Sequence, residues 1–174
     1  WCATSSGPEC VPHYGAAFLF LEYFLERFGE TATRALVAHP ANGLAAMDVV
    51  LQELGTVDTL SGKPINADTF FADWVVANYL GDTSWADGRY GYSDYTAAPR
   101  AARTASLACR AGAGELNVHQ YAADYITIDC PSATRARFIG DEQVRAVPAG
   151  PHSGDFMFWG NRQDSSDTTL TREF

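Results

Sequence analysis

Hydrophobic side chains are most concentrated in residues 13–28, which read HYGAAFLFLEYFLERF. Pro12 precedes this stretch and Gly29 follows it, and both residue types are common at the ends of helices. Apolar side chains would point in nearly every direction around such a helix, and three charged residues are left for water: Glu22, Glu26 and Arg27. A helix with this pattern is buried on most of its sides. We therefore predict a central core helix, with the other elements packed around it.

Three further helices are predicted after this one. Apolar residues and turn signals place them at residues 31–38, 43–54 and 69–80. Gly55 ends the second of these helices. We expect Asn42 to cap the second helix and Asn66 or Asp68 to cap the third, because short polar side chains accept hydrogen bonds from the free N–H groups of a first turn.

The pattern changes after the last helix. Residues 81–103 are rich in Gly, Asp, Tyr and Pro and follow neither the helical nor the strand period, so we predict an ordered loop or a linker. Beyond residue 104, apolar and polar residues alternate as they do in β-strands. The predicted strands are 116–121, 125–130, 135–139, 143–147, 155–159 and 168–174.

Helices followed by strands predict an α+β fold. We expect an N-terminal helical bundle around one buried helix, followed by an antiparallel β-sheet or sandwich-like region. Turn residues separate the predicted strands, as they do between antiparallel neighbours. The helical subdomain is placed at residues 1–103 and the antiparallel β subdomain at residues 104–174.

Composition and charge narrow the classes of partner. Of the 174 residues, 47% are hydrophobic and 19% are charged, which is ordinary for a globular protein. The formal net charge is −9, from 21 acidic and 12 basic residues. The sequence has no basic cluster to displace counterions from phosphates, so we expect neither nucleic acid nor an anionic membrane as a partner. The core helix is too short and too charged at its end to cross a bilayer.

The four cysteines fall into two separate pairs, Cys2 with Cys10 and Cys109 with Cys130. Neither spacing is CxxC, and no histidine lies at a zinc-finger distance, so we expect no structural zinc site. Two local disulfides are the simplest of the three connectivities, and free buried thiols are the alternative. Disulfides indicate a secreted, extracellular protein. The sequence begins at Trp1 without a signal peptide, and we expect a segment upstream of it to have been removed.

No motif of a catalytic centre is present. No histidine lies four residues from another, so there is no HExxH helix; the histidines are His13, His39, His119 and His152. The chain also has no Gly-rich phosphate loop and no GxSxG nucleophile elbow. We therefore predict that the chain is not an enzyme on its own and holds no metal.

His13 and Tyr14 form the polar pair of most interest. They lie at the start of the core helix, where backbone N–H groups and the helix dipole favour an anion or an oxyanion. The alternative is that both residues serve only the packing and capping of the helix. They are the two candidates for a role in a cleft.

Much of the chain resembles the C-terminal helical half of secreted bacterial zinc metallopeptidases. The similar segments are HYGAAFLFLEYFLERFGETATRALVAHPANGLAAMDVVL (13–51) and FADWVVANYLGD (71–82). These peptidases are the gluzincin-like and immune inhibitor A-like members of the HExxH superfamily. Segments 118–126 and 151–174 resemble the β-region that follows the peptidase in those proteins. The resemblance covers most of residues 13–174.

The resemblance implies that the zinc-binding residues and the part of the protein that matches this chain lie in different segments. In that family, the HExxH helix and a downstream glutamate hold zinc, and both lie N-terminal to the part that matches this chain. Zinc is therefore expected only in an upstream segment, and no cofactor is expected in this chain. In related enzymes a tyrosine near the start of a YxxG helix steadies the tetrahedral oxyanion. Tyr14-Gly15 has a comparable place with a shorter spacing.

Two functions follow, from different classes. The first is a non-catalytic part of a secreted zinc-metallopeptidase-like protein, which forms the floor of the cleft and a β-module. The second is an extracellular structural protein that joins copies of itself, or a β-partner, through a strand edge near its C-terminus. A head-to-tail contact of this kind would give filaments. The expected assembly edge consists of Thr168, Leu170, Arg172 and Phe174, with Phe158 and Trp159 on a nearby strand.

Overall fold

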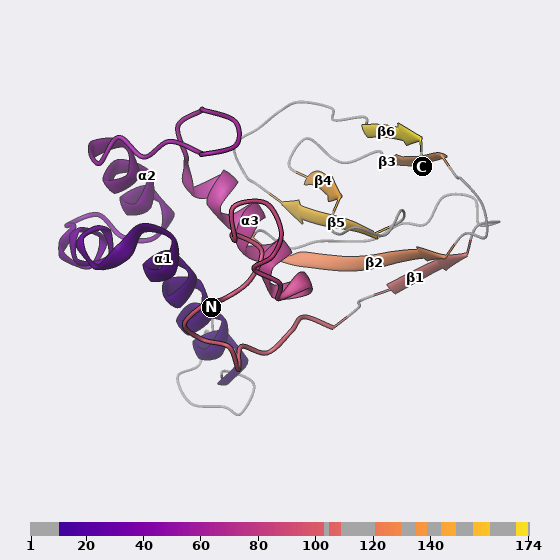
Figure 1. The fold of residues 1–174 in the computed structure, drawn as a ribbon, viewed down its shortest axis with the longest axis horizontal. Coiled ribbons are helices and arrows are strands. Elements are labelled where there is room, and N and C mark those ends of the chain that lie inside the picture. The colour runs from indigo at the N-terminus through magenta and orange to yellow at the C-terminus, as the bar shows by residue number, and fades with distance from the viewer. Residues whose placement is uncertain are drawn as a thin grey trace. The chain divides into compact units, whose positions relative to one another are not determined.

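The computed structural model describes residues 11–102, 105–108, 121–129, 135–138, 144–148, 155–160 and 170–173 (Figure 1). Within these residues the helices come first: α1 (Val11–Ala38), α2 (Leu44–Glu53) and α3 (Ala67–Leu80). The strands follow: β1 (Ala105–Ala108), β2 (Ala123–Asp129), β3 (Arg135–Phe138), β4 (Val144–Pro148), β5 (Asp155–Gly160) and β6 (Leu170–Glu173). This order of elements confirms the α+β class.

The described residues belong to two compact units. The first unit contains the chain up to Phe70 together with Gly81–Ala98, and the second contains Phe71–Leu80 and the chain from Pro99 onward. Helix α3 therefore begins in the first unit and continues in the second, whereas the sequence pattern suggested one boundary at residue 103.

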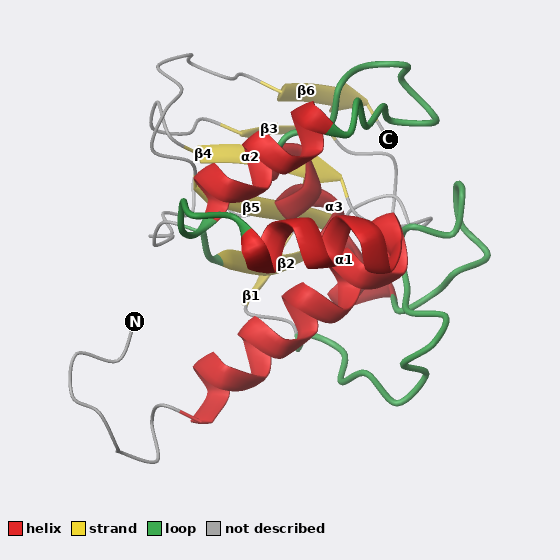
Figure 2. Cartoon of the chain, turned by 90° about the vertical axis from the view of Figure 1, so that its left-hand side faces the viewer, coloured by secondary structure: helices red, strands yellow, loops and turns green. Residues whose placement is uncertain are grey.

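Helix α1 is broken at Gly29, where the sequence predicts the end of the core helix. Gly29 has φ 78° and ψ 177°, so the chain leaves the helical region and α1 divides into two helical parts (Figure 2). A positive φ strains any residue that carries a Cβ atom, which is why glycine suits this position. Beyond the kink, the Thr33 hydroxyl donates to the Gly29 carbonyl oxygen at 3.0 Å. The predicted helix 31–38 is the second part of α1.

The prediction that helix 13–28 is buried on most sides is wrong for its first half. Tyr23 and Phe24 are 1% and 0% exposed, whereas Tyr14, Phe18 and Leu21 are 73%, 53% and 46% exposed. The three exposed residues are spaced i, i+4 and i+7, so they share one face of the helix. A run of apolar residues does not require burial all round, because much of any protein surface is apolar. We call these three residues the exposed α1 stripe.

Phe70, near the start of α3, anchors the core of the first unit. Four aromatic rings of α1 have their centroids 5.1 to 5.5 Å from its ring: Phe20, Tyr23, Phe24 and Phe28. Helix α2 contributes four buried side chains to the first unit: Ala46, Met47, Val50 and Leu51. These contacts bury α1 mainly between Phe20 and Phe28, whereas residues 13–18 at its start are exposed.

Of the predicted helix caps, Asn66 is confirmed and Asn42 is wrong. Asn66 Oδ1 accepts a hydrogen bond from Thr69 N at 2.9 Å, and Asp48 Oδ1 on α2 accepts one from Ala67 N at 2.7 Å. Together they satisfy N–H groups that the first turn of α3 leaves free. Helix α2 begins after Gly43, which has φ 67° and provides no side-chain cap.

Residues 81–98 are an ordered loop of the first unit, one of the two predicted alternatives. Asp82 N donates to the Tyr90 carbonyl oxygen at 2.9 Å and closes the loop. At Gly91 the two arms approach so closely that a Cβ atom would lie 2.8 Å from Asp82 N. Arg89 and Tyr92 are buried within it, at 4% and 8% exposure. A loop with a buried arginine needs partners for that charge inside the protein.

The strands of the second unit form two sheets within the described residues (Figure 1). One has the order β1-β2-β5-β4, with β1 parallel to β2 and the other neighbours antiparallel. The other is the antiparallel pair β3 and β6. The prediction of a purely antiparallel region is therefore wrong at β1. Residues 109–122 between β1 and β2 are long enough for the crossover that a parallel pair needs.

Within the second unit, helix α3 contacts two tyrosines at and before the start of β2, Tyr121 and Tyr125. The Tyr125 hydroxyl on β2 donates to the Val75 carbonyl oxygen at 3.0 Å, and the Tyr125 ring is stacked on Tyr79 with the centroids 5.4 Å apart. The ring of Phe71 meets that of Tyr121 edge-on at 5.2 Å. These contacts place the last turns of α3 against the start of β2.

Five of the predicted strands are confirmed, with shifts at their ends, as β2, β3, β4, β5 and β6. Strand β1 was not predicted. The predicted strand 116–121 lies almost entirely outside the described residues. So do Thr168, Phe174, His119, His152 and the four cysteines, Cys2, Cys10, Cys109 and Cys130. The two disulfides therefore stay predictions.

The unequal burial along α1 predicts unequal effects of truncation. Phe24→Ala should lower the free energy of unfolding by about 3–5 kcal/mol, because it leaves a cavity beneath Phe70. Leu21→Ala should cost within about 1 kcal/mol, because that side chain is half exposed. Urea denaturation of both variants checks this, and equal losses at the two positions would contradict the burial pattern.

Candidate functional site

A buried arginine, Arg89, joins three segments of the first unit. Its Nε and Nη2 donate to the two carboxylate oxygens of Asp87, each at 2.7 Å. Its Nη1 donates to Asp58, and its Nη2 also donates to the Thr59 hydroxyl at 3.1 Å. A two-pronged arginine–carboxylate pair is among the strongest hydrogen-bonded arrangements in proteins. We call these four residues the Arg89 cluster: Asp58, Thr59, Asp87 and Arg89.

The Arg89 cluster is tied to helix α1 at two points. The buried hydroxyl of Tyr23 donates to the Arg89 carbonyl oxygen at 2.6 Å. Arg27, one turn further along α1, lies with Nη1 3.4 Å from Asp87 Oδ1. The backbone and the side chain of Arg89 are therefore both held, and the loop 81–98 is fixed against α1.

Asp58 belongs to a tight turn that the sequence forms locally. Its carboxylate accepts hydrogen bonds from Leu60 N at 3.1 Å and Ser61 N at 2.6 Å, the bonding pattern of an Asx turn. Its own N–H donates to the Lys63 carbonyl oxygen at 2.8 Å, and Gly62 supplies a φ of 69°. One oxygen of Asp58 thus holds the turn while the other faces Arg89.

Both carboxyl groups of the cluster have lowered pKa values. Partial burial raises the pKa of Asp58, but hydrogen bonds from Ser61 and Arg89 outweigh it and lower the pKa from 3.8 to about 2. Hydrogen bonds from Arg89 hold the pKa of Asp87 well below its usual range, against the opposite effect of partial burial. Both groups are therefore charged at neutral pH and poorly suited to proton transfer.

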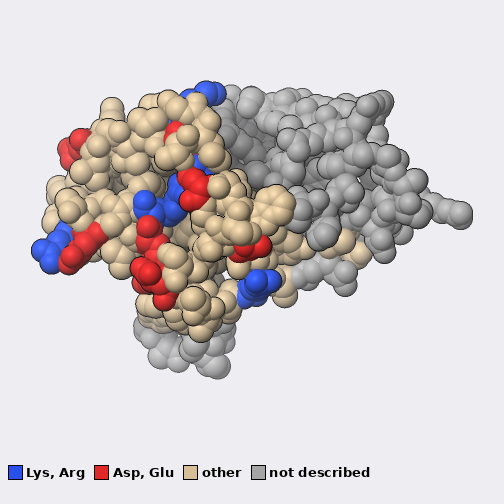
Figure 3. Space-filling model, in the orientation of Figure 1, with Lys and Arg blue, Asp and Glu red and all other residues tan. Residues whose placement is uncertain are grey.

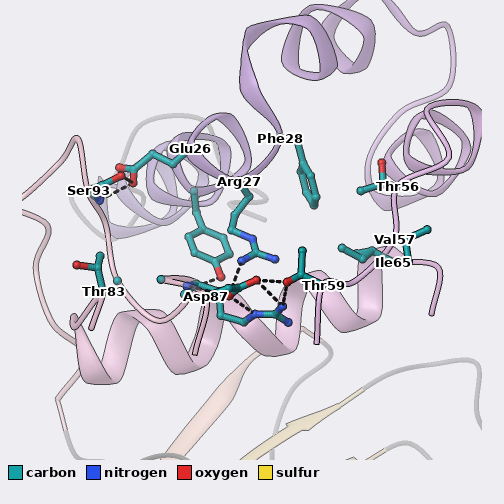
Figure 4. A pocket seen from close by; sticks show the side chains of 14 residues that line it. Glu26, Arg27, Phe28, Thr56, Val57, Thr59, Ile65, Thr83, Asp87 and Ser93 are labelled. Carbon is teal, nitrogen blue, oxygen red and sulfur yellow. Dashed lines mark hydrogen bonds and ion pairs between the residues drawn. The ribbon is translucent and has the colours of Figure 1, made fainter. Parts of the chain in front are cut away.

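A pocket of about 490 Å³ lies beside the Arg89 cluster (Figure 4). Helix α1, the loop 56–65 and the loop 81–98 form its walls. Its lining includes apolar side chains (Tyr23, Phe28, Val57, Ile65) and polar ones (Glu26, Arg27, Thr56, Thr59, Thr83, Asp87, Arg89, Ser93). Its volume is in the range of small-molecule sites.

Glu26, which the sequence placed in a polar stripe facing water, instead holds one wall of this pocket. Its carboxylate accepts hydrogen bonds from Ser93 N at 2.6 Å and the Ser93 hydroxyl at 2.8 Å. It also accepts bonds from Asp94 N and Tyr95 N, each at 3.2 Å. A carboxylate with this many donors fixes the loop that follows the Arg89 cluster.

Charges on the described surface are interleaved on the face drawn in Figure 3. Basic atoms lie beside acidic ones over the helices and loops of the first unit. This arrangement agrees with the ion pairs of Arg89 and Arg27, whose partners are both aspartates. Part of the acidic charge of the first unit is therefore paired locally with arginines, while the net charge stays at −9.

The sequence candidates His13 and Tyr14 lie in the first part of α1, and both are exposed. The Arg89 cluster and the pocket are built by residues from Tyr23 onward, so the structure does not bring His13 or Tyr14 into this site. His39 Nδ1 accepts a hydrogen bond from Ala41 N at 3.1 Å and serves the turn before α2.

Within the described part of the chain, no three His, Cys, Asp or Glu side chains come together as a metal site would require. In the same part of the chain, no helix has the length and apolar character needed to span a membrane.

We compared the chain with protein families, curated proteins and solved structures. No family model, no curated protein and no solved structure matches the chain. The resemblance to zinc metallopeptidases therefore stays a prediction drawn from the sequence.

Sequence reasoning missed the Arg89 cluster and the pocket. The members of the cluster are separated by about thirty positions along the chain and follow no helical or strand period. The one local signal is the segment Asp58 to Lys63, whose Asp, Ser and Gly residues are typical of a turn. That signal locates the turn without indicating its partner.

The lowered pKa values predict a loss of stability in acid. A carboxyl group with a lower pKa in the folded chain than in the unfolded chain stabilises the fold above its unfolded pKa, and the effect is lost as pH falls toward the folded pKa. For Asp58 this amounts to roughly 2 kcal/mol, lost between about pH 4 and pH 2. Urea denaturation against pH checks the loss.

Asp58→Asn provides the matched test. The free-energy difference between this variant and the parent chain should shrink as the pH approaches about 2, because protonated Asp58 then resembles asparagine. The control is Glu30→Gln, which removes the exposed pair with Arg34 and should change stability by less than about 0.5 kcal/mol at every pH. A constant difference for Asp58→Asn would contradict the assignment.

Proposed function

We propose that this chain is a non-catalytic part of a secreted zinc-metallopeptidase-like protein. In this proposal the first unit contributes the floor of a cleft, and the strands form a β-module, with sandwich-like packing of their sheets. The zinc ligands and the general base belong to a segment upstream of Trp1, and this chain positions that segment. The sequence resemblance over residues 13–51 and 71–82 is the starting point of the proposal.

The observation that carries the proposal is the exposed α1 stripe. Tyr14, Phe18 and Leu21 present apolar surface along one face of the first part of α1. The ring of Phe18 meets that of Tyr95 edge-on at 5.7 Å, and more than half of Phe18 is still exposed. Exposed apolar side chains on one helix face can contact another protein segment. The stripe falls within the segment HYGAAFLFLEYF that carries the resemblance. Its proposed partner is the zinc-binding segment, which would place His13 and Tyr14 at the edge of the cleft.

The second candidate is an extracellular assembly protein, and the topology of the strands favours part of it. Among the described strands, β6, with Leu170 and Arg172, has one neighbour, β3. An unpaired strand edge can accept a strand from another chain. Strand β5, with Phe158 and Trp159, lies between β2 and β4, so these two residues are not on an edge. Light scattering that shows a monomer at all concentrations, with and without residues 170–174, would exclude this candidate.

The first test of the proposed function asks whether the chain alone cleaves protein and whether an HExxH segment is encoded upstream. The purified chain with added Zn²⁺ should not cleave an unstructured protein such as casein, and the reading frame upstream of the Trp1 codon should encode an HExxH segment. Chelator-sensitive cleavage by the chain alone, or an upstream frame without HExxH, would contradict the proposal.

The second test compares two exposed apolar residues of α1 in the longer protein that contains the HExxH segment. Leu21→Ser should lower peptidase activity by about tenfold, because a polar residue would weaken the contact with the zinc-binding segment. Val37→Ser, at a residue that is 76% exposed in the second part of α1, is the control and should leave activity unchanged. Equal effects of the two substitutions would show that the stripe has no special role.

A further inference from the structure

The pocket beside the Arg89 cluster contains one cation whose hydrogen-bonding capacity is largely unused. A guanidinium carries five N–H donors. Arg27 forms one ion pair among the described residues, with Nη1 3.4 Å from Asp87 Oδ1. Its Nε is buried and has no hydrogen-bond partner in that part of the chain. Buried polar groups in native proteins are nearly always paired, so an exception calls for an explanation.

The other charged groups that line the pocket are already satisfied. The carboxylate of Asp87 accepts both prongs of Arg89 and the hydroxyl of Thr59. Glu26 accepts four hydrogen bonds from the segment 93–95. Arg89 is neutralised by two aspartates. Arg27 is therefore the charged group of the lining with N–H donors left for a ligand, and because its Nε is closed to solvent, a ligand would meet the guanidinium at its Nη atoms.

The surroundings of Arg27 suit a ligand with an apolar body. Figure 4 shows the side chain of Arg27 pointing toward Asp87, with Phe28, Ile65 and Val57 on one side of it. The Arg27 side chain is mostly buried, with 15% of it exposed. Hydrogen bonds to a charged donor are stronger where water is largely excluded. Apolar walls with a few polar groups that fix orientation are the usual composition of small-molecule sites.

We propose that this pocket binds a small organic carboxylate, with the carboxylate on Arg27 and the apolar body against Phe28, Val57 and Ile65. A carboxylate matches the fork of a guanidinium and carries a single negative charge. A phosphate with two charges is disfavoured, because Asp87 and Glu26 line the same pocket and repel additional negative charge. The proposal is independent of the metallopeptidase assignment.

The test uses 3-phenylpropionate as the probe and the uncharged 3-phenylpropionamide as its match. Isothermal titration calorimetry on the full chain should show saturable binding of the acid at one site, with affinity that falls as salt is added. The amide should bind at least about tenfold more weakly, since it cannot form the charged pair. Inorganic phosphate should bind more weakly than the acid.

The variants Arg27→Gln and Arg34→Gln test whether the carboxylate binds to Arg27. Arg27→Gln should weaken binding of the acid by at least about tenfold and abolish the preference over the amide. Arg34→Gln removes an arginine of the same helix that is 78% exposed, and should bind like the parent chain. Equal binding of acid and amide, unchanged binding by Arg27→Gln, tighter binding of phosphate, or no saturable binding of the acid would each overturn the proposal. If Arg27→Gln does not fold, the comparison of acid and amide on the parent chain still tests whether the pocket prefers a carboxylate.

Discussion

The buried charge of Arg89 is the constraint on which the first unit depends. A guanidinium that is 4% exposed must be neutralised and hydrogen-bonded within the protein. Asp58 and Asp87 supply the negative charge from two loops, and Tyr23 holds the backbone of Arg89 from α1. The desolvation of the arginine thus requires three segments, far apart in the sequence, to keep one arrangement.

This constraint explains why irregular segments can define a pocket. Loops without regular structure usually have few internal hydrogen bonds and vary in position. Here the turn at Asp58 and the loop around Asp87 are joined by one guanidinium, and Glu26 holds the following residues 93–95. The pocket wall is therefore fixed by charge pairing, and Arg27 faces a site whose other charged groups are already paired.

Local sequence patterns predicted most helices and strands. The pairing of β1 with β2 and the Arg89 cluster depend on contacts between residues far apart in the sequence. The kink at Gly29, the cap at Asn66 and the strand β2 follow from neighbouring residues, and the sequence located them. The exposed first half of α1 was missed, because apolar periodicity does not show which faces find a partner. The parallel pairing of β1 with β2 and the Arg89 cluster depend on residues distant in sequence, which no local period records. The candidate pocket could not be predicted for the same reason.

The stability of a variant at Arg89 tests this account most directly. Arg89→Met, compared with Arg34→Met on the exposed surface of α1, separates the buried charge cluster from an ordinary ion pair. In urea denaturation at neutral pH, Arg89→Met should lose about 3 kcal/mol or more, because it leaves two aspartates without their partner. Arg34→Met should lose less than about 0.5 kcal/mol. Equal stability of the two variants, or a gain in stability for Arg89→Met, would show that the first unit does not depend on this cluster.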